Sequence, residues 1–78
     1  MKDFLKNRRK KLQLTQKEMA NKMKLKGDRG DNVIHQWEIG KRLPSVTVLL
    51  DLKEAYEMTD AELLQWLKFI NQNKKENN

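Results

Sequence analysis

The chain has 78 residues, no cysteine, one histidine and a formal net charge of +6 at pH 7. This length allows one domain around a small apolar core, and the lack of cysteine excludes a disulfide framework and a thiolate metal site. The apolar runs are too short for a membrane-spanning helix or the core of a signal peptide, so we expect a cytoplasmic protein without membrane contact.

The residue inventory does not favour catalysis. A single histidine, His35, can neither build a histidine metal cluster nor pair with a cysteine nucleophile. The glycine-containing segment KGDRGDN, residues 26–32, lacks the spacing of a phosphate-binding loop. We therefore expect no enzymatic activity, no catalytic residue, no metal site and no cofactor.

The charge is unevenly distributed along the chain. Residues 1–42 carry thirteen Lys/Arg and five Asp/Glu, a net of +8, whereas residues 43–78 carry four and six, a net of −2. A basic front half favours a polyanionic partner such as nucleic acid. The alternative is a lysine-rich surface that is merely solvated.

The first helix is expected to begin after Asp3, a suitable N-cap, and to end near residue 12 or 13. Thr15 and Glu18 have the spacing of a capping box, in which each side chain satisfies an unpaired backbone N–H, so they start the second helix. Apolar residues at helical spacing give this helix a core-facing stripe. These residues are Met19, Ala20 and Met23.

The periodicity stops at residues 26–32, where two glycines disfavour a helix. It resumes in NVIHQWEI, and Gly40 is suited to end this third helix in a left-handed conformation. Ser45 is the expected N-cap of the fourth helix, and Thr59 and Glu62 form a second capping box before the fifth. The sequence therefore predicts five helices and no strand.

The last helix is more apolar than one covered face requires. We expect one domain over residues 1–72, with this helix at 60–72, and a polar, frayed tail at 73–78. An exposed apolar patch on the helix would mark an interface between two copies of the chain; alternatively, the large side chains fold over the small core. The patch residues are Trp66, Phe69 and Ile70.

Three stretches taken together resemble a known family. LTQKEMANKM, IHQWEIGKRLPSVTVLLDL and EMTDAELL are similar, in this order, to the Cro/C1-type (XRE family) helix-turn-helix DNA-binding domain of phage and bacterial repressors. The resemblance covers roughly residues 5–64. It implies an all-α, compact five-helix, lambda-repressor-like domain in which the second and third helices form the DNA-binding unit and the third enters the major groove.

The resemblance implies four base-reading positions on the third helix: Asp31, Asn32, His35 and Gln36. The amides of Asn32 and Gln36 can pair with adenine, whereas Asp31 could only accept a hydrogen bond, for example from cytosine N4. Asp31 could instead stabilise the positive N-terminal end of the helix. For His35, a contact with the DNA backbone or with solvent is the alternative.

Other positions are implied to contact the DNA backbone, where basic side chains supply affinity without sequence information. These positions are Gln16, Lys17, Arg29, Lys41 and Arg42. Arg9 and Glu38 match places where the family ties the recognition helix to the scaffold through an ion pair. We therefore expect a partly buried, structural pair between them.

The chain departs from the family pattern in the turn between the second and third helices, which is four residues longer. Counting back from the third helix puts Gly30 at its N-cap; Asp28 or Asp31 could cap it instead in a shifted register, which would move the base-reading set. Two smaller departures are Glu57, where glycine often ends the fourth helix, and Arg8, at a position that is often apolar.

These features predict a sequence-specific, double-stranded-DNA-binding transcriptional regulator, a repressor acting as a homodimer on a palindromic operator. The alternative is the antitoxin of a toxin–antitoxin pair, which would bind a protein toxin and regulate its own operon. Both hypotheses include DNA as a partner. They differ in whether DNA or a protein toxin is the main partner.

Overall fold

The computed structural model describes the backbone of residues 3–25 and 27–76 and the side chains of residues 3–25 and 27–72. This part of the chain forms five helices and no strand, so the all-α prediction is confirmed. The helices are α1 (Phe4–Lys11), α2 (Gln16–Lys22), α3 (Gly30–Glu38), α4 (Val46–Ala55) and α5 (Asp60–Glu76).

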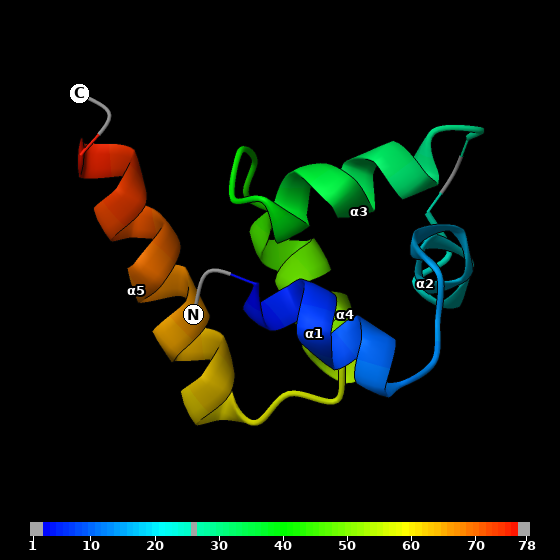
Figure 1. The fold of residues 1–78 in the computed structure, drawn as a ribbon, viewed down its shortest axis with the longest axis horizontal. Helices are drawn as coiled ribbons and strands as arrows, with labels where there is room; N and C mark the ends of the chain where they lie inside the picture. Colours follow the sequence, from blue (N-terminus) through cyan, green and yellow to red (C-terminus); the bar gives the residue numbers. More distant parts are fainter. Residues whose placement is uncertain (1–2, 26, 77–78) are drawn as a thin grey trace.

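In Figure 1, α3 lies across the top of the molecule, and α2 is seen end-on near the N-terminal end of α3. α1 crosses in front of α4, and α5 stands at the left with its C-terminal end upward. α5 continues to Glu76, beyond the expected end at residue 72. Of the tail expected to be frayed, residues 77–78 lie outside the described residues.

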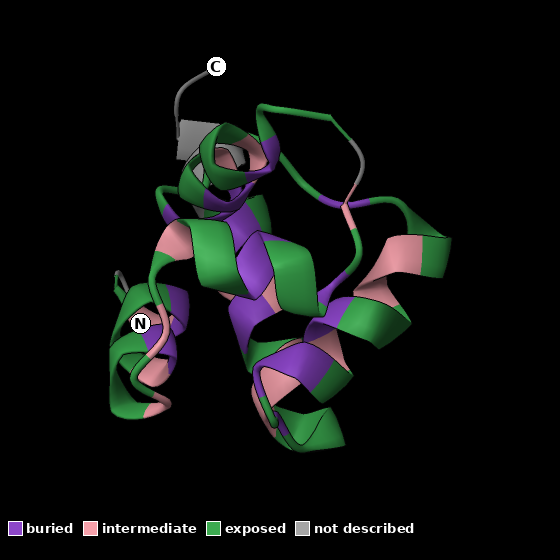
Figure 2. Ribbon diagram, turned by 90° about the vertical axis from the view of Figure 1, so that its right-hand side faces the viewer, coloured by how far each residue is buried: buried purple, intermediate pink, exposed green. Residues whose placement is uncertain are grey.

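The core is formed by side chains from all five helices, and Figure 2 shows the buried residues on the inward faces with exposed residues outside. Trp37 and Tyr56 are buried, as their apolar spacing indicates. The other core residues are apolar and almost completely buried. They are Leu5, Met19, Ala20, Met23, Ile34, Leu52, Ala55, Met58, Trp66 and Ile70.

The prediction of an exposed apolar patch on the last helix is wrong for Trp66 and Ile70. Trp66 and Ile70 are only 2% and 3% exposed, and Phe69 packs partly buried against the core. The loop after α3 approaches this helix, since a Cβ at Gly40 would lie 3.6 Å from Ile70 Cδ1. α5 thus uses these large side chains to close the core of its own chain.

Both capping boxes are present. The Thr15 hydroxyl accepts from the Glu18 N–H while the Glu18 carboxylate accepts from the Thr15 N–H, and Thr59 and Glu62 repeat the arrangement. The backbone hydrogen bond from Thr15 lowers the pKa of Glu18. Asp3 occupies the N-cap of α1 without a side-chain capping bond. The boxes therefore fix the starts of α2 and α5.

Three helices end through a non-glycine residue in the left-handed region: Gln13 at φ 63°, Lys24 at φ 58° and Glu57 at φ 53°. The last of these explains the missing glycine after the fourth helix, because Glu57 adopts the conformation that glycine would supply. A side chain in this region is strained by contact between its Cβ and the backbone.

Gln13→Gly is therefore expected to raise the free energy of unfolding by up to about 1 kcal/mol, because glycine removes this strain. The matched control is Lys10→Gly, at an exposed position inside α1, the helix that Gln13 follows. This substitution should lower the free energy of unfolding by about 1 kcal/mol. Urea denaturation followed by circular dichroism measures both. Equal destabilisation by the two substitutions would contradict the left-handed assignment.

Candidate nucleic-acid interface

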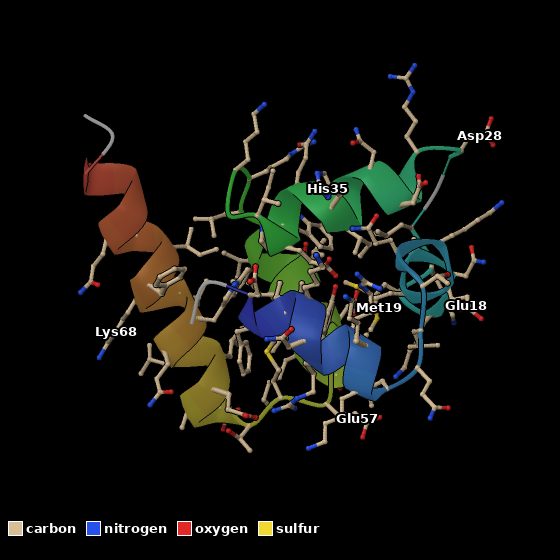
Figure 3. All side chains as sticks on the ribbon, viewed as in Figure 1. Glu18, Met19, Asp28, His35, Glu57 and Lys68 are labelled. Carbon is tan, nitrogen blue, oxygen red and sulfur yellow. The ribbon has the colours of Figure 1, made fainter. Side chains whose placement is uncertain are left out.

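The outward side of α3 carries the four residues expected to read bases. Asp31, Asn32 and His35 are exposed and Gln36 is half-buried, whereas Ile34 on the opposite side is fully buried. The helical period explains the division, because residues three or four apart share a face. Figure 3 shows His35 on the outer side of α3. The structure thus brings these four polar side chains to one helix.

α2 and α3 pack at unusually short range through Gly30. A Cβ built on Gly30 would lie 2.8 Å from the Cβ of Ala20, closer than real Cβ contacts. Gly30 is buried and is the first residue of α3, and Arg29 occupies the N-cap. The expectation that Gly30 is an N-cap is therefore corrected: its lack of a side chain serves the contact between helices.

Neither alternative cap is used by the helix. The structure shows no side-chain capping bond at the start of α3. Asp31 lies in the first turn, where its carboxylate accepts from the N–H of Asn32 at 2.9 Å. A carboxylate there is favoured by the partial positive charge of the helix start. Asp28 lies exposed in the preceding loop, as Figure 3 shows.

Gln16 connects the start of α2 to the surface of α3. Its Nε2 donates to Glu38 Oε1 at 3.2 Å and lies 3.4 Å from His35 Nδ1. Gln16 was expected to contact the DNA backbone, yet in the free chain its amide lies between two α3 side chains. The terminal amide has two N–H donors, and the positions of Gln16 and His35 are linked through them.

A buried polar cluster holds the C-terminal end of α3 in place. Arg9 Nε donates to Glu38 Oε2 at 2.6 Å and Arg9 Nη2 donates to Glu38 Oε1 at 3.1 Å, so the expected ion pair is bidentate. The Tyr56 hydroxyl donates to Glu38 Oε2 at 3.1 Å, and Arg9 Nη1 donates to the Leu14 carbonyl at 2.9 Å. The cluster ties α1, α3 and the end of α4 together.

The electrostatics of the cluster follow from this geometry. The hydrogen bond to Glu38 raises the pKa of Arg9 above its ordinary value. Burial raises the pKa of Tyr56, because its ionised form would lie in the core beside the Glu38 carboxylate. Arg9 therefore stays charged and Tyr56 stays neutral at physiological pH. Periodicity pointed to Tyr56 as an apolar core residue, but not to its hydroxyl as the third member of the cluster.

The loop after α3 presents basic side chains but not free amides. Gly40 has φ 77°, and the N–H groups of Lys41 and Arg42 both donate to the Gln36 carbonyl, at 3.0 and 3.4 Å. The resemblance implies that Lys41 and Arg42 contact the DNA backbone here. Because these amides end α3, only the exposed side chains of Lys41 and Arg42 remain for an anion.

The basic side chains expected on phosphate flank α3 at both ends. Arg29 precedes the helix, whereas Lys41 and Arg42 follow it, and all three are exposed. The loops before and after α3 lie along the same upper side of Figure 1. Lys17 is exposed near the start of α2. The arrangement is a polar helix face between two cationic loops, which suits the edge of a polyanion.

Arg8 has a role that the sequence did not reveal. Its Nη1 donates to the carbonyls of Glu57 and Tyr56, at 2.6 and 3.3 Å, and its Nη2 pairs with Glu62 at 2.5 Å. The backbone N–H of Thr59 lowers the pKa of Glu62, and Arg8 lowers it further. Arg8 thereby joins the end of α4 to the start of α5. An arginine at a position that is often apolar in the resembled family was the available signal.

Within the described residues, no group of three or more His, Cys, Asp or Glu side chains could hold a metal ion. No helix in the same part of the chain is long and apolar enough to cross a membrane. Comparison of the sequence and the fold with protein-family models, curated proteins and solved structures gives no match.

Proposed function

We propose that this protein is a sequence-specific double-stranded-DNA-binding regulator of the Cro/C1 type, with α2 and α3 as a helix-turn-helix unit and α3 in the major groove. One observation carries the proposal: the outward side of α3 presents amide and imidazole side chains between loops that carry Arg29 at one end and Lys41 and Arg42 at the other. A protein that reads DNA needs both base-edge donors and flanking phosphate contacts.

Each side chain has a role that its chemistry supports. Asn32 and Gln36 offer the paired donor and acceptor that match adenine N6 and N7. His35, oriented by Gln16, donates to a base edge or to the nearby backbone. Asp31 repels phosphate, so it lowers affinity for DNA in general and raises the relative weight of the base contacts.

The buried cluster supports specificity through rigidity. Direct readout requires side chains held at defined positions relative to the groove, on an element that does not shift. Glu38 ends α3, and its bonds to Arg9 and Tyr56 anchor that end to two other helices. At the other end, Gly30 brings α3 against Ala20. Both ends of the proposed recognition helix are thus fixed independently of DNA.

A symmetric operator bound by two copies remains part of the proposal, because one α3 spans only part of a helical turn of DNA. The burial of Trp66 and Ile70 within one chain removes the exposed patch from which pairing through α5 was expected. We therefore do not place the contact between operator-bound copies on α5.

The DNA claim is tested by binding titrations at several salt concentrations. Phosphate contacts release counterions, so affinity should fall steeply with salt, and Lys41→Ala and Arg42→Ala should each reduce the log–log slope by about 0.9. Lys68→Ala is the matched control, because Lys68 is exposed on α5, away from α3 (Figure 3). Weak, salt-independent binding to every duplex, or an equal effect of Lys68→Ala, would contradict the proposal.

A further inference from the structure

The side chain of Gln16 lies between a buried carboxylate and an exposed imidazole. Gln16 is the first residue of α2, and the capping box of Thr15 and Glu18 fixes the backbone at this point. Its Nε2 donates to Glu38 Oε1 at 3.2 Å and lies 3.4 Å from His35 Nδ1. Glu38 is buried, whereas His35 is exposed on the outer side of α3 (Figure 3). Gln16 therefore links the core to the surface that is proposed to face DNA.

The carboxylate of Glu38 decides which way round the amide of Gln16 lies. Glu38 accepts two hydrogen bonds from Arg9 and one from the Tyr56 hydroxyl, in addition to the bond from Gln16. An ion-paired carboxylate can only accept hydrogen bonds. If the amide turned over, Gln16 Oε1 would face Glu38 Oε1, and two acceptors would meet at a half-buried position. The nitrogen of the Gln16 amide therefore stays on the side of Glu38.

This orientation determines which nitrogen of His35 carries the proton. Gln16 Nε2 has two N–H groups, and the one that Glu38 does not use is available to His35 Nδ1. A nitrogen that accepts this N–H carries no proton of its own, so the proton of the neutral ring lies on His35 Nε2. With its acceptor turned toward Gln16, His35 offers only the Nε2–H donor to an outside partner.

The same bonds make the Gln16 side chain unsuitable for phosphate. Both N–H groups of the amide are used within the chain, so the part left for a partner is Oε1, an acceptor. Phosphate oxygens are acceptors too and need a donor opposite them. The resemblance implies that Gln16 contacts the DNA backbone, but the group that it leaves free has the wrong chemistry for that contact.

We propose that Gln16 is a positioning residue whose side chain does not touch DNA, and that it sets His35 to donate to guanine in the major groove. Guanine alone presents two acceptors and no donor at its major-groove edge, whereas adenine and cytosine each present an amino group there. An Nε2–H donor therefore suits guanine best. This inference rests on the proposed function, since it names the base that one side chain of α3 reads.

Nuclear magnetic resonance of the free chain at alkaline pH, where imidazole is neutral, tests the positioning without DNA. His35 is the single histidine of the chain, and long-range proton–nitrogen correlation spectra distinguish its two tautomers. We expect the Nε2–H form to dominate in the wild type. Gln16→Met keeps a long side chain but has no N–H, so it should shift the ring toward a mixture of both forms.

The matched control is Gln65→Met, the same substitution at an exposed position on α5, which should leave the His35 spectrum unchanged. Circular dichroism verifies that both variants are folded. A wild-type ring with its proton mainly on Nδ1 would overturn the proposal. So would a tautomer ratio that is the same in Gln16→Met and in the wild type.

Selection of bound duplexes from a random-sequence pool tests the role of the pair on DNA. His35→Ala and Gln16→Met should each lower the preference for guanine at one and the same position of the motif, by about 2- to 10-fold, the worth of one hydrogen bond. Weaker binding of Gln16→Met to all sequences with an unchanged motif would indicate a direct phosphate contact and overturn the inference alone. If the wild type enriches no motif, the proposed function fails, and the inference fails with it.

Discussion

Glu38→Ala is expected to lower the free energy of unfolding by about 3–5 kcal/mol, as the loss of one partner of a buried ion pair does. The substitution leaves the Arg9 guanidinium buried and charged without its partner, and the Tyr56 hydroxyl loses its acceptor. An unpaired buried charge costs far more than the net stabilisation of the intact pair. Urea denaturation of the variant measures the loss.

Removing all three polar side chains of the cluster separates the cost of the stranded charge from the cost of lost packing. Replacing Arg9 with Met, Glu38 with Leu and Tyr56 with Phe should recover most of the stability, because well-packed apolar residues often substitute for a buried ion pair without net loss. Glu54→Ala, an exposed acid on α4, should change stability by no more than about 0.5 kcal/mol. A triple variant as unstable as Glu38→Ala would show that shape, and not the stranded charge, causes the effect.

Gly30→Ala is expected to destabilise the domain by about 1–3 kcal/mol, as overpacking of a close contact does. The direction of this change in stability is informative, because alanine is normally favoured over glycine in a helix by up to about 1 kcal/mol. Here the new methyl group would lie 2.8 Å from Ala20 Cβ. A Cβ cannot rotate away as the end of a long side chain can, so α2 and α3 must separate.

A swap of the two residues identifies the contact. Ala20→Gly alone should lose about 1 kcal/mol, from helix propensity and lost packing, whereas Ala20→Gly combined with Gly30→Ala restores room for one methyl group. We expect the double variant to be more stable than Gly30→Ala alone, a positive coupling that distant sites do not show. Additive losses, or a Gly30→Ala protein more stable than the wild type, would contradict the short approach of α2 and α3.

Local signals in the sequence were sufficient for the number of helices and for the starts of α2 and α5. Capping boxes such as Thr15 with Glu18, and a residue like Gly40, act through a few neighbouring backbone groups, so their spacing alone locates the ends of helices. The Arg9–Glu38 pair was found differently, through matched positions in a resembled family. Nothing in local spacing brings residues 29 positions apart together.

The remaining features depend on how helices are placed in space. Apolar spacing in α5 marks Trp66 and Ile70 as candidates for burial or for an interface, but only the placement of α5 against the rest of the chain decides between the two. The need for glycine at position 30 depends on the distance between α2 and α3. The bonds of Arg8 require the end of α4 to pass beside α1. Periodicity contains none of these distances.

The most direct test of DNA reading by α3 is a selection of bound duplexes from a random-sequence pool, made in parallel with the wild type, Asn32→Ala, Gln36→Ala and Arg42→Ala. We expect the wild type to enrich one short motif. Asn32→Ala and Gln36→Ala should each relax that motif at discrete positions, whereas Arg42→Ala should weaken binding and leave the motif unchanged. No enrichment, or one motif for the wild type and both α3 variants, would contradict the assignment of α3 as the element that reads DNA.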